Sequence, residues 1–458
     1  MTVEFSPSSH RRPRRAVALL FVALLAACGG GGDDGGGGNP PLSCSADDQK
    51  TWLQSYFGDW YFWYKLAPRP DPLASASVDD YFKALLYTGT DAAFPNDRWS
   101  NFESTESFNR FFGDGQSLGY GVSVAGLEVK GLPGQPLYVR YVEPLSPAAA
   151  GGLARGDQVL GINGRSAADI ITADDFTALT AAAAGETLTL RLQNVGGERT
   201  VTLTAATYTL TPVSRAAVVT TPLGRKMGYV VIKDMIRQSL TPLNTAFADF
   251  RAQGVSEIVL DLRYNGGGLV SVASAIAGYV GGIGAAGKTF ASLLYNDQRA
   301  AAENSVFRFA NPAPAAALSL PKVYVLSGRR TCSASEQIIN GLRGVGIDVI
   351  AIGETSCGKP VGFLPKSNEC GTTYSVVNFE SVNERTEGRY FDGFNATCAV
   401  AEDWAKPLGA ADEPLLNAAR LHADAGACPV AAARERPLFR RSAADRAEPG
   451  ERQGMIPR

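Results

Sequence analysis

The chain has 458 residues and a formal net charge of -2, and 45% of its residues are hydrophobic. This length and composition are typical of a globular protein with roughly two to three domains. The charges nearly balance and form no basic stripe along the central part, which argues against a nucleic-acid partner. Only two histidines are present, His10 and His422. A Ser-His-Asp relay is therefore nearly excluded, and with no Cys-x-x-Cys pair we expect no metal and no cofactor.

The N-terminus has the pattern of a secretory signal peptide. A stretch with four arginines precedes the apolar run 16–27, which is too short to span a bilayer. The run ends in Leu25-Ala26-Ala27-Cys28, which resembles the lipobox of bacterial lipoproteins; an ordinary cleaved signal followed by a free thiol is the alternative. The resemblance implies that Cys28 carries lipid and becomes the new N-terminus. We therefore expect a lipid-anchored protein of a bacterial cell envelope, facing the periplasm from the outer membrane.

Changes in composition along the chain set the domain boundaries that we expect. They are a signal peptide (1–27), a glycine-rich linker (28–42), a helical domain (43–115), a β-rich domain (116–210), an α/β domain (211–429) and a tail (430–458). The tail is rich in arginine and poor in apolar residues, which predicts disorder.

The segment 43–115 has a helical, aromatic pattern. Aromatic residues recur at spacings of three and four in Trp52, Tyr56, Trp60 and Trp63. Such a stripe is typical of a helical core rather than of an aromatic ligand cage. Ser45, Asp47 or Asp48 could cap the first helix.

The β-rich segment consists of short apolar runs broken by turns. The runs 118–124 and 137–142 are followed by a short helical stretch at 146–149, a Gly156-Asp157 turn and an Ile-Asn-Gly hairpin at 162–164. This order resembles a PDZ domain, which binds an extended peptide at a sheet edge and its terminal carboxylate in a nest of backbone amides. The resemblance places that nest at Gly119, Tyr120, Gly121 and Val122; a tight turn in any β domain is the alternative reading.

From residue 228 onward strands and helices alternate, which predicts an α/β layer fold with active groups at the turns from strand to helix. The expected strands are 229–232, 258–262, 323–326 and 349–352. The expected helices are 243–252, 269–279 and 333–343.

Three of these turns carry unusual residues. They read Asp261-Leu-Arg-Tyr-Asn-Gly-Gly-Gly268, Ser333-Ala-Ser-Glu336 and Gly353-Glu-Thr-Ser-Cys-Gly-Lys359. Together, behind a PDZ-like segment, they resemble the carboxyl-terminal processing (tail-specific) serine peptidases. The resemblance implies a crotonase-like ββα core with a PDZ domain inserted into it or preceding it, and an N-terminal helical segment.

The resemblance also assigns roles to residues. Ser333 is the nucleophile and Lys359 the general base, which must be desolvated enough to be neutral. The amides of Gly267 and Ala334 form the oxyanion hole. Glu336 is the nearest candidate for an orienting third residue, because Phe363 stands where many members have glutamine. The alternatives are a capping box for Ser333 with Glu336 and a solvated surface lysine for Lys359.

Seven cysteines are present, and six remain when Cys28 is set aside. An even number in an exported protein predicts disulfides, with 15 possible pairings. If the catalytic assignment holds, Cys332 and Cys357 flank the nucleophile and the base, so we expect a bond between them. Cys370 with Cys398 is a second expectation, which leaves Cys44 with Cys428.

These features predict an envelope serine endopeptidase that cleaves proteins or peptides recognised by their free C-termini through a Ser-Lys dyad and an acyl-enzyme. The alternative is a catalytically inactive, PDZ-containing peptide-binding lipoprotein. A more distant alternative is an acyl-thioester enzyme, because the crotonase-like core is shared with such enzymes. Export, disulfides and a PDZ domain argue against a CoA substrate.

Overall fold

The computed structural model describes residues 43–429, 452 and 454–457. The predictions of a signal peptide, of lipid on Cys28 and of the glycine-rich linker fall on residues outside this part. Among the described residues, no helix is both long and apolar enough to cross a membrane.

A six-stranded sheet forms the centre of the α/β region, in the order β10-β11-β12-β16-β17-β22. Its strands are β10 (Val213–Thr220), β11 (Lys226–Ile232), β12 (Glu257–Asp261), β16 (Lys322–Ser327), β17 (Asp348–Gly353) and β22 (Cys398–Ala399). All pairs are parallel except β10 with β11. Every residue of β12 is buried, as expected for a parallel sheet covered on both faces.

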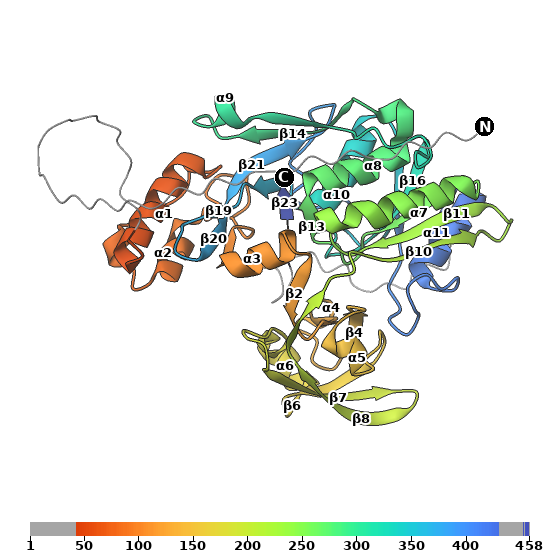
Figure 1. Cartoon of the computed structure of the whole chain (residues 1–458), viewed down its shortest axis with the longest axis horizontal. Helices are drawn as coiled ribbons and strands as arrows, with labels where there is room; N and C mark the ends of the chain where they lie inside the picture. The colour runs from red at the N-terminus through yellow and green to blue at the C-terminus, as the bar shows by residue number, and fades with distance from the viewer. Residues whose placement is uncertain (1–42, 430–451, 453, 458) are drawn as a thin grey trace, which may run out of the picture. The chain divides into compact units, whose positions relative to one another are not determined.

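Helices cover both faces of this sheet (Figure 1). They are α7 (Leu240–Ala252), α8 (Val270–Ala285), α10 (Ala334–Gly344) and α11 (Pro414–Ala425). Successive side chains of β11 alternate between the faces: Val230 packs in the core under α7, α8 and α10, and Val231 in the core under α11. The predicted alternation of strands and helices is confirmed, and it places three turns at one end of the sheet.

A second, antiparallel sheet has the order β15-β14-β21-β18. Its strands are β14 (Thr289–Tyr295), β15 (Ser305–Arg308), β18 (Val361–Phe363) and β21 (Val377–Val382), with α9 (Ala300–Glu303) between β14 and β15. A three-stranded sheet combines β1 (Asn101–Ser104), β19 (Lys366–Ser367) and β20 (Thr372–Ser375). Strand β1 comes from the N-terminal region, so this region and the α/β region share a sheet.

The N-terminal region contains α1 (Ala46–Trp60), α2 (Val78–Leu85) and α3 (Thr105–Phe112). Ser45 caps α1 by accepting a hydrogen bond from the Asp48 amide, one of the caps expected from the sequence. The aromatic stripe is core, as predicted, although part of its core is supplied by later strands through Phe363 and Tyr374.

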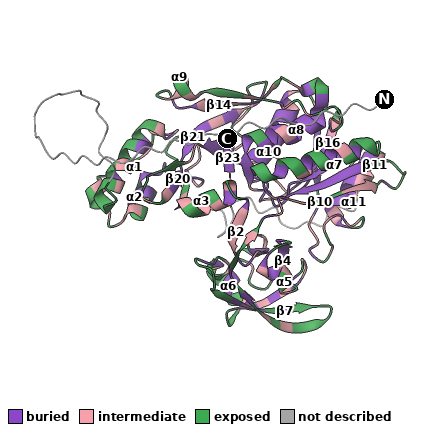
Figure 2. Ribbon diagram, viewed as in Figure 1, coloured by how far each residue is buried: buried purple, intermediate pink, exposed green. Residues whose placement is uncertain are grey.

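The PDZ segment has a sheet of order β3-β4-β5-β7-β8, with β6 beside β5. Its strands are β3 (Val122–Val124), β4 (Leu137–Val142), β5 (Gln158–Ile162), β6 (Arg165–Ser166), β7 (Thr187–Asn194) and β8 (Gly197–Thr204), and its helices are α4 (Gly126–Val129), α5 (Pro147–Ala150) and α6 (Ala167–Ala173). Two strands, β2 (Gln116–Gly119) and β9 (Ala206–Thr209), pair where the segment begins and ends. Figure 2 shows the hairpin of β7 and β8 largely exposed and the central sheet of the α/β region largely buried.

The part of the chain that the structure describes has three disulfides, and the predicted Cys332–Cys357 bond is one of them. The predictions of Cys370 with Cys398 and of Cys44 with Cys428 are wrong, because the bonds are Cys44–Cys370 and Cys398–Cys428. Helix α11 packs on the same core as β22, so the chain just after the helix returns to Cys398. Cys370 lies in the turn between β19 and β20, beside the N-terminal region that carries Cys44.

The predicted disorder of the tail is contradicted at its end. Residues Gly454–Ile456 form strand β23, which pairs in parallel with β13 (Gly267–Leu269). Met455 and Ile456 are buried, so burial of two apolar side chains accompanies the ordering of this segment.

Candidate active site

Ser333 occupies a strained turn at the start of α10. Its backbone has φ +62° and ψ -117°, a conformation that costs energy for any residue but glycine. The residue is fully buried, and its Oγ has no hydrogen-bond partner among the described residues. Of the capping box that was the alternative reading, only the hydrogen bond from the Ser333 amide to Glu336 forms, and the hydroxyl is left for another use.

Lys359 lies on the turn after β17 and is fully buried, so the alternative of a solvated surface lysine is wrong. Its Nζ lies 3.7 Å from the centre of the Phe363 ring. Burial disfavours the charged ammonium, whereas an aromatic face favours it. Phe363 thus contacts the amine at the position where the resemblance would have placed a glutamine.

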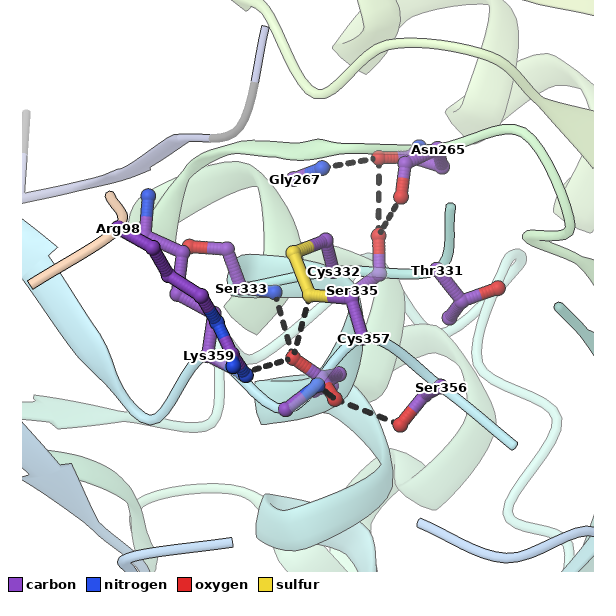
Figure 3. The surroundings of a disulfide bond; sticks show 12 residues. Arg98, Asn265, Gly267, Thr331, Cys332, Ser333, Ser335, Ser356, Cys357 and Lys359 are labelled. Atoms are coloured by element: carbon purple, nitrogen blue, oxygen red, sulfur yellow. Dashed lines mark hydrogen bonds between the residues drawn. A yellow bond between two sulfur atoms is a disulfide. The ribbon is translucent and has the colours of Figure 1, made fainter. Parts of the chain in front are cut away.

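The turns that carry Ser333 and Lys359 lie side by side (Figure 3). Glu336 joins these turns through its carboxylate. One oxygen, Oε2, accepts hydrogen bonds from the amides of Ser333 at 2.9 Å and Lys359 at 2.8 Å. The other, Oε1, accepts from the Gly358 amide at 2.8 Å and from Ser356 Oγ at 2.6 Å. Burial raises the pKa of Glu336, and these four hydrogen bonds oppose that rise. The carboxylate therefore holds the backbones of the predicted nucleophile and base on a single atom.

The Cys332–Cys357 disulfide is a second link between the same turns, with its Cα atoms 5.1 Å apart. Cys332 directly precedes Ser333, and Cys357 lies two residues before Lys359. The bond and the Glu336 carboxylate together fix the separation of the two turns.

The two predicted oxyanion donors differ in the structure. Ala334 is the first residue of α10, so its amide has no acceptor within the helix. The Gly267 amide, in contrast, donates to Asn265 Oδ1 at 2.8 Å. Because N–H groups alternate along a strand, the amide of the next residue, Gly268, is directed to the opposite side, toward β23.

Asn265 fixes this turn against α10. Its side-chain oxygen also accepts from Ser335 Oγ at 2.9 Å, and its Nδ2 donates to the Ile232 carbonyl at 2.9 Å. No role was predicted for Asn265, and its place inside the Asp261 to Gly268 motif was the available signal.

A buried ionic network behind the site was also missed. Arg263 pairs with Asp261 and, through two hydrogen bonds of 2.7 and 3.0 Å, with Glu413 at the start of α11. It also contacts Glu402, which accepts a hydrogen bond of 2.8 Å from Arg155 of the PDZ segment. The Asp-Leu-Arg part of the motif is therefore structural, and it connects the turn that carries Gly267 to the PDZ segment.

The predicted carboxylate nest of the PDZ segment, Gly119 to Val122, lines a cavity of about 150 Å³. Arg140, Lys233 and Arg330 also line this cavity, together with the carboxylates Glu143 and Asp234, so the lining carries charges of both signs. Gly121 has φ +74°, and a Cβ at this position would collide with Ser146. Only glycine fits there.

His422 belongs to a different part of the molecule. It lies on α11 in the core against the other face of the sheet, where its ring contacts Tyr324. Burial lowers the pKa of His422, in keeping with a core histidine.

Three family descriptions match consecutive parts of the chain. They are the peptidase S41 N-terminal domain over residues 48–101, the PDZ domain over 112–193 and peptidase family S41 over 226–387. The chain belongs to peptidase family S41. All three motifs that carry the candidate site fall within the matched family S41 segment, and the fold is that of the S41 peptidases with a PDZ domain.

Relatives and solved structures agree with this family. The carboxyl-terminal-processing protease of Picosynechococcus is 28% identical over 242 residues, which are 52% of this chain and 55% of the relative. Carboxyl-terminal-processing peptidase 3 of Arabidopsis thaliana, a chloroplast protein, is 33% identical over 134 residues, 27% of this chain and 26% of the relative. The chain thus spans between about a quarter and just over half of these relatives' lengths. A crystal structure from Bacteroides fragilis assigned to the S41 proteases superposes with a TM-score of 0.62 at 27% identity, covering 82% of this chain and 97% of that one.

Proposed function

We propose that this chain is an envelope serine endopeptidase that acts through a Ser333-Lys359 dyad. The observation that carries the proposal is the shared carboxylate of Glu336, which holds the backbones of both residues on one oxygen atom. A scaffold without activity has no need for a strained serine whose hydroxyl is left without a partner. The inactive peptide-binding alternative therefore explains less.

In the proposed reaction, neutral Lys359 removes the proton of Ser333 Oγ as this oxygen attacks the substrate carbonyl. The protonated lysine then gives the proton to the leaving amine, and an acyl-enzyme remains. Water activated by the same lysine releases the acyl group. Glu336 contacts neither reacting atom, so we assign it as a positioning residue.

For the oxyanion hole we retain Ala334 and replace Gly267 by Gly268 as the second donor. The Gly267 amide is already used by Asn265, whereas that of Gly268 is directed toward the strand added to β13. Donors held in place before the reaction stabilise the developing charge without reorganisation.

The PDZ segment, with expected bounds 116–210, would select substrates by a free C-terminus bound at Gly119 to Val122. The expected catalytic domain, 211–429, would then cut the tail. We further propose that a lipid on Cys28 anchors the enzyme in the outer membrane, facing the periplasm, which detergent partitioning of the wild type and of Cys28→Ala would test.

The test uses an unfolded reporter protein with an apolar C-terminus. Ser333→Ala and Lys359→Ala should each abolish cleavage without additive loss in the double variant, and activity should rise from neutral to mildly alkaline pH as the lysine loses its proton. His422→Asn is the control and should retain activity. Near-normal turnover by either dyad variant would refute the assignment, and equal cleavage of reporters with free and amidated C-termini would refute the role of the PDZ segment.

A further inference from the structure

The end of the chain lies in the candidate active site. Strand β23, at the dark-blue end of the colour bar in Figure 1, extends β13 in parallel, with Gly454 opposite Gly267 and Met455 opposite Gly268. The Gly454 amide donates to the Gly266 carbonyl at 3.0 Å. This is how a peptide binds by strand addition.

The segment lies between the predicted oxyanion turn and the strand that follows the base. A Cβ on Gly362, three residues after Lys359, would come within 2.5 Å of the Met455 carbonyl. Met455 is fully buried and Ile456 is 6% exposed. Both belong to the core that also contains Leu269 and Ala334.

The Gly454 carbonyl faces the oxyanion donors. A Cβ on Gly267 would collide with this carbonyl oxygen, and the same Cβ would lie 2.9 Å from the Ala334 amide nitrogen. The parallel register also places the carbonyl opposite the amide of Gly268. The tail therefore presents a peptide carbonyl where a substrate carbonyl would have to enter.

Arg452 anchors the segment on the N-terminal region. Its guanidinium pairs with Glu103 of β1, donates to Ser107 Oγ at 2.7 Å and lies 4.4 Å from the centre of the Phe111 ring. An arginine with partners of three kinds defines the register of the residues that follow. The segment lines a cavity of about 860 Å³, whose walls also include Phe112 and, from the PDZ segment, Leu118 and Thr180.

We propose that Arg452 and residues 454–457 belong to a tethered, substrate-like inhibitor that occupies the site until a substrate tail replaces it. The proposal rests on the proposed function and also specifies a ligand class: extended peptides with a small residue at the position of Gly454 followed by two apolar residues. Occupancy is reversible, and no bond is made or broken. Ser333 is fully buried in this arrangement, and we expect release of the segment to expose it.

The test compares full-length variants by the rate at which a fluorophosphonate labels Ser333. Met455→Asp should release the segment, because a carboxylate cannot remain at a fully buried apolar position. A tethered ligand has an effective concentration near the millimolar range, so labelling should accelerate by about tenfold or more. Arg452→Glu is a second variant, for use if Met455→Asp fails to fold. The new carboxylate repels Glu103 at the surface, so labelling should accelerate, although by less. Val195→Asp, at a fully exposed position of the β7–β8 hairpin, is the matched control and should label like the wild type.

A fluorescent peptide with the sequence of residues 452–458, Arg-Gln-Gly-Met-Ile-Pro-Arg, separates the two proposals. It should bind the Ser333→Ala, Met455→Asp double variant and slow the labelling of Met455→Asp competitively. Binding without labelling of any variant would uphold the docking of the segment and refute the serine chemistry. The inhibitor proposal would be overturned if the wild type and both tail variants were labelled at equal rates. It would also be overturned if the peptide did not bind. A wild-type labelling rate that rises on dilution would also overturn it, since the segment would then come from a second copy. Loss of the last four residues, detected by mass spectrometry of the intact protein, would overturn it too.

Discussion

Replacing Glu336 separates positioning from chemistry at this site. In Glu336→Ala the three buried amides and the Ser356 hydroxyl lose their acceptor. Each unsatisfied buried donor costs about 1–3 kcal/mol. Even if water satisfies some of them, we expect a loss of at least about 3 kcal/mol, a large part of the 5–15 kcal/mol typical of a folded protein.

Glu336→Gln should cost less, because its amide group can be oriented to spare the reacting turns. The oxygen of the glutamine can keep the Oε2 position, and so retain the amides of Ser333 and Lys359. Its NH₂ group then faces Ser356, whose hydroxyl can rotate to accept, and the Gly358 amide, which cannot. One lost donor predicts a destabilisation of about 1–3 kcal/mol.

The assay measures urea unfolding together with kcat, KM and the pH profile of reporter cleavage. Positioning predicts a large loss of kcat for Glu336→Ala, partial rescue by Glu336→Gln, and an unchanged KM for both. Glu198→Gln, on the exposed PDZ hairpin, is the control of equal composition. If Glu336→Gln were folded and stable yet as inactive as Ser333→Ala, Glu336 would take part in the proton transfer, and the positioning argument would be refuted.

Two further predictions follow from the disulfides and from a buried carboxylate. Replacing Cys332 and Cys357 by Ala should lower kcat by roughly tenfold to a hundredfold, because small displacements of reacting groups slow the reaction strongly. Replacing Cys44 and Cys370 should reduce thermal stability and leave kcat nearly unchanged. Equal losses of kcat in the two double variants would contradict a specific role of the Cys332–Cys357 bond at the site. Burial, reinforced by the nearby Asp234 and opposed by Lys233, raises the pKa of Glu143 from its ordinary 4.5 to about 7. Because this pKa is raised in the folded state, protonated Glu143 contributes to the free energy of unfolding below pH 4.5. This contribution, at most about 3 kcal/mol, is lost as the pH rises through 7. Glu143→Gln should remove this loss in urea unfolding measured from pH 4 to 8, and an unchanged pH dependence would show that the group is not buried as described.

The order of strands and helices was predictable from the sequence because each element carries a strong local signal. Strand β12 is centred on the apolar run 258–260, and α10 begins at a Ser-x-x-Glu motif. The disulfide between Cys332 and Cys357 followed from the assigned roles of their neighbours. The remaining two pairings depend on how distant segments pack, and no local pattern records that Cys370 lies beside the N-terminal region.

The choice between adjacent glycines also required the structure. The sequence motif does not distinguish Gly267 from Gly268, but in strand β13 their amides are directed to opposite sides. The ordered end of the tail escaped prediction for a related reason. Met455 and Ile456 are too few to give a periodic pattern, and they are buried only because an edge of β13 is available.

The shared aromatic core has a consequence for the order in which the protein can fold. Helices α1 and α2 pack around Trp63 and Tyr81, but the same cluster needs Phe363, Tyr374 and Val377. At about 5–20 residues per second, synthesis of the intervening stretch takes roughly 15 to 60 seconds. During this interval the first helices expose aromatic surface that only a distant segment can cover, and the Cys44–Cys370 bond cannot form. We therefore expect the segment matched as a separate N-terminal domain to aggregate when it is expressed alone.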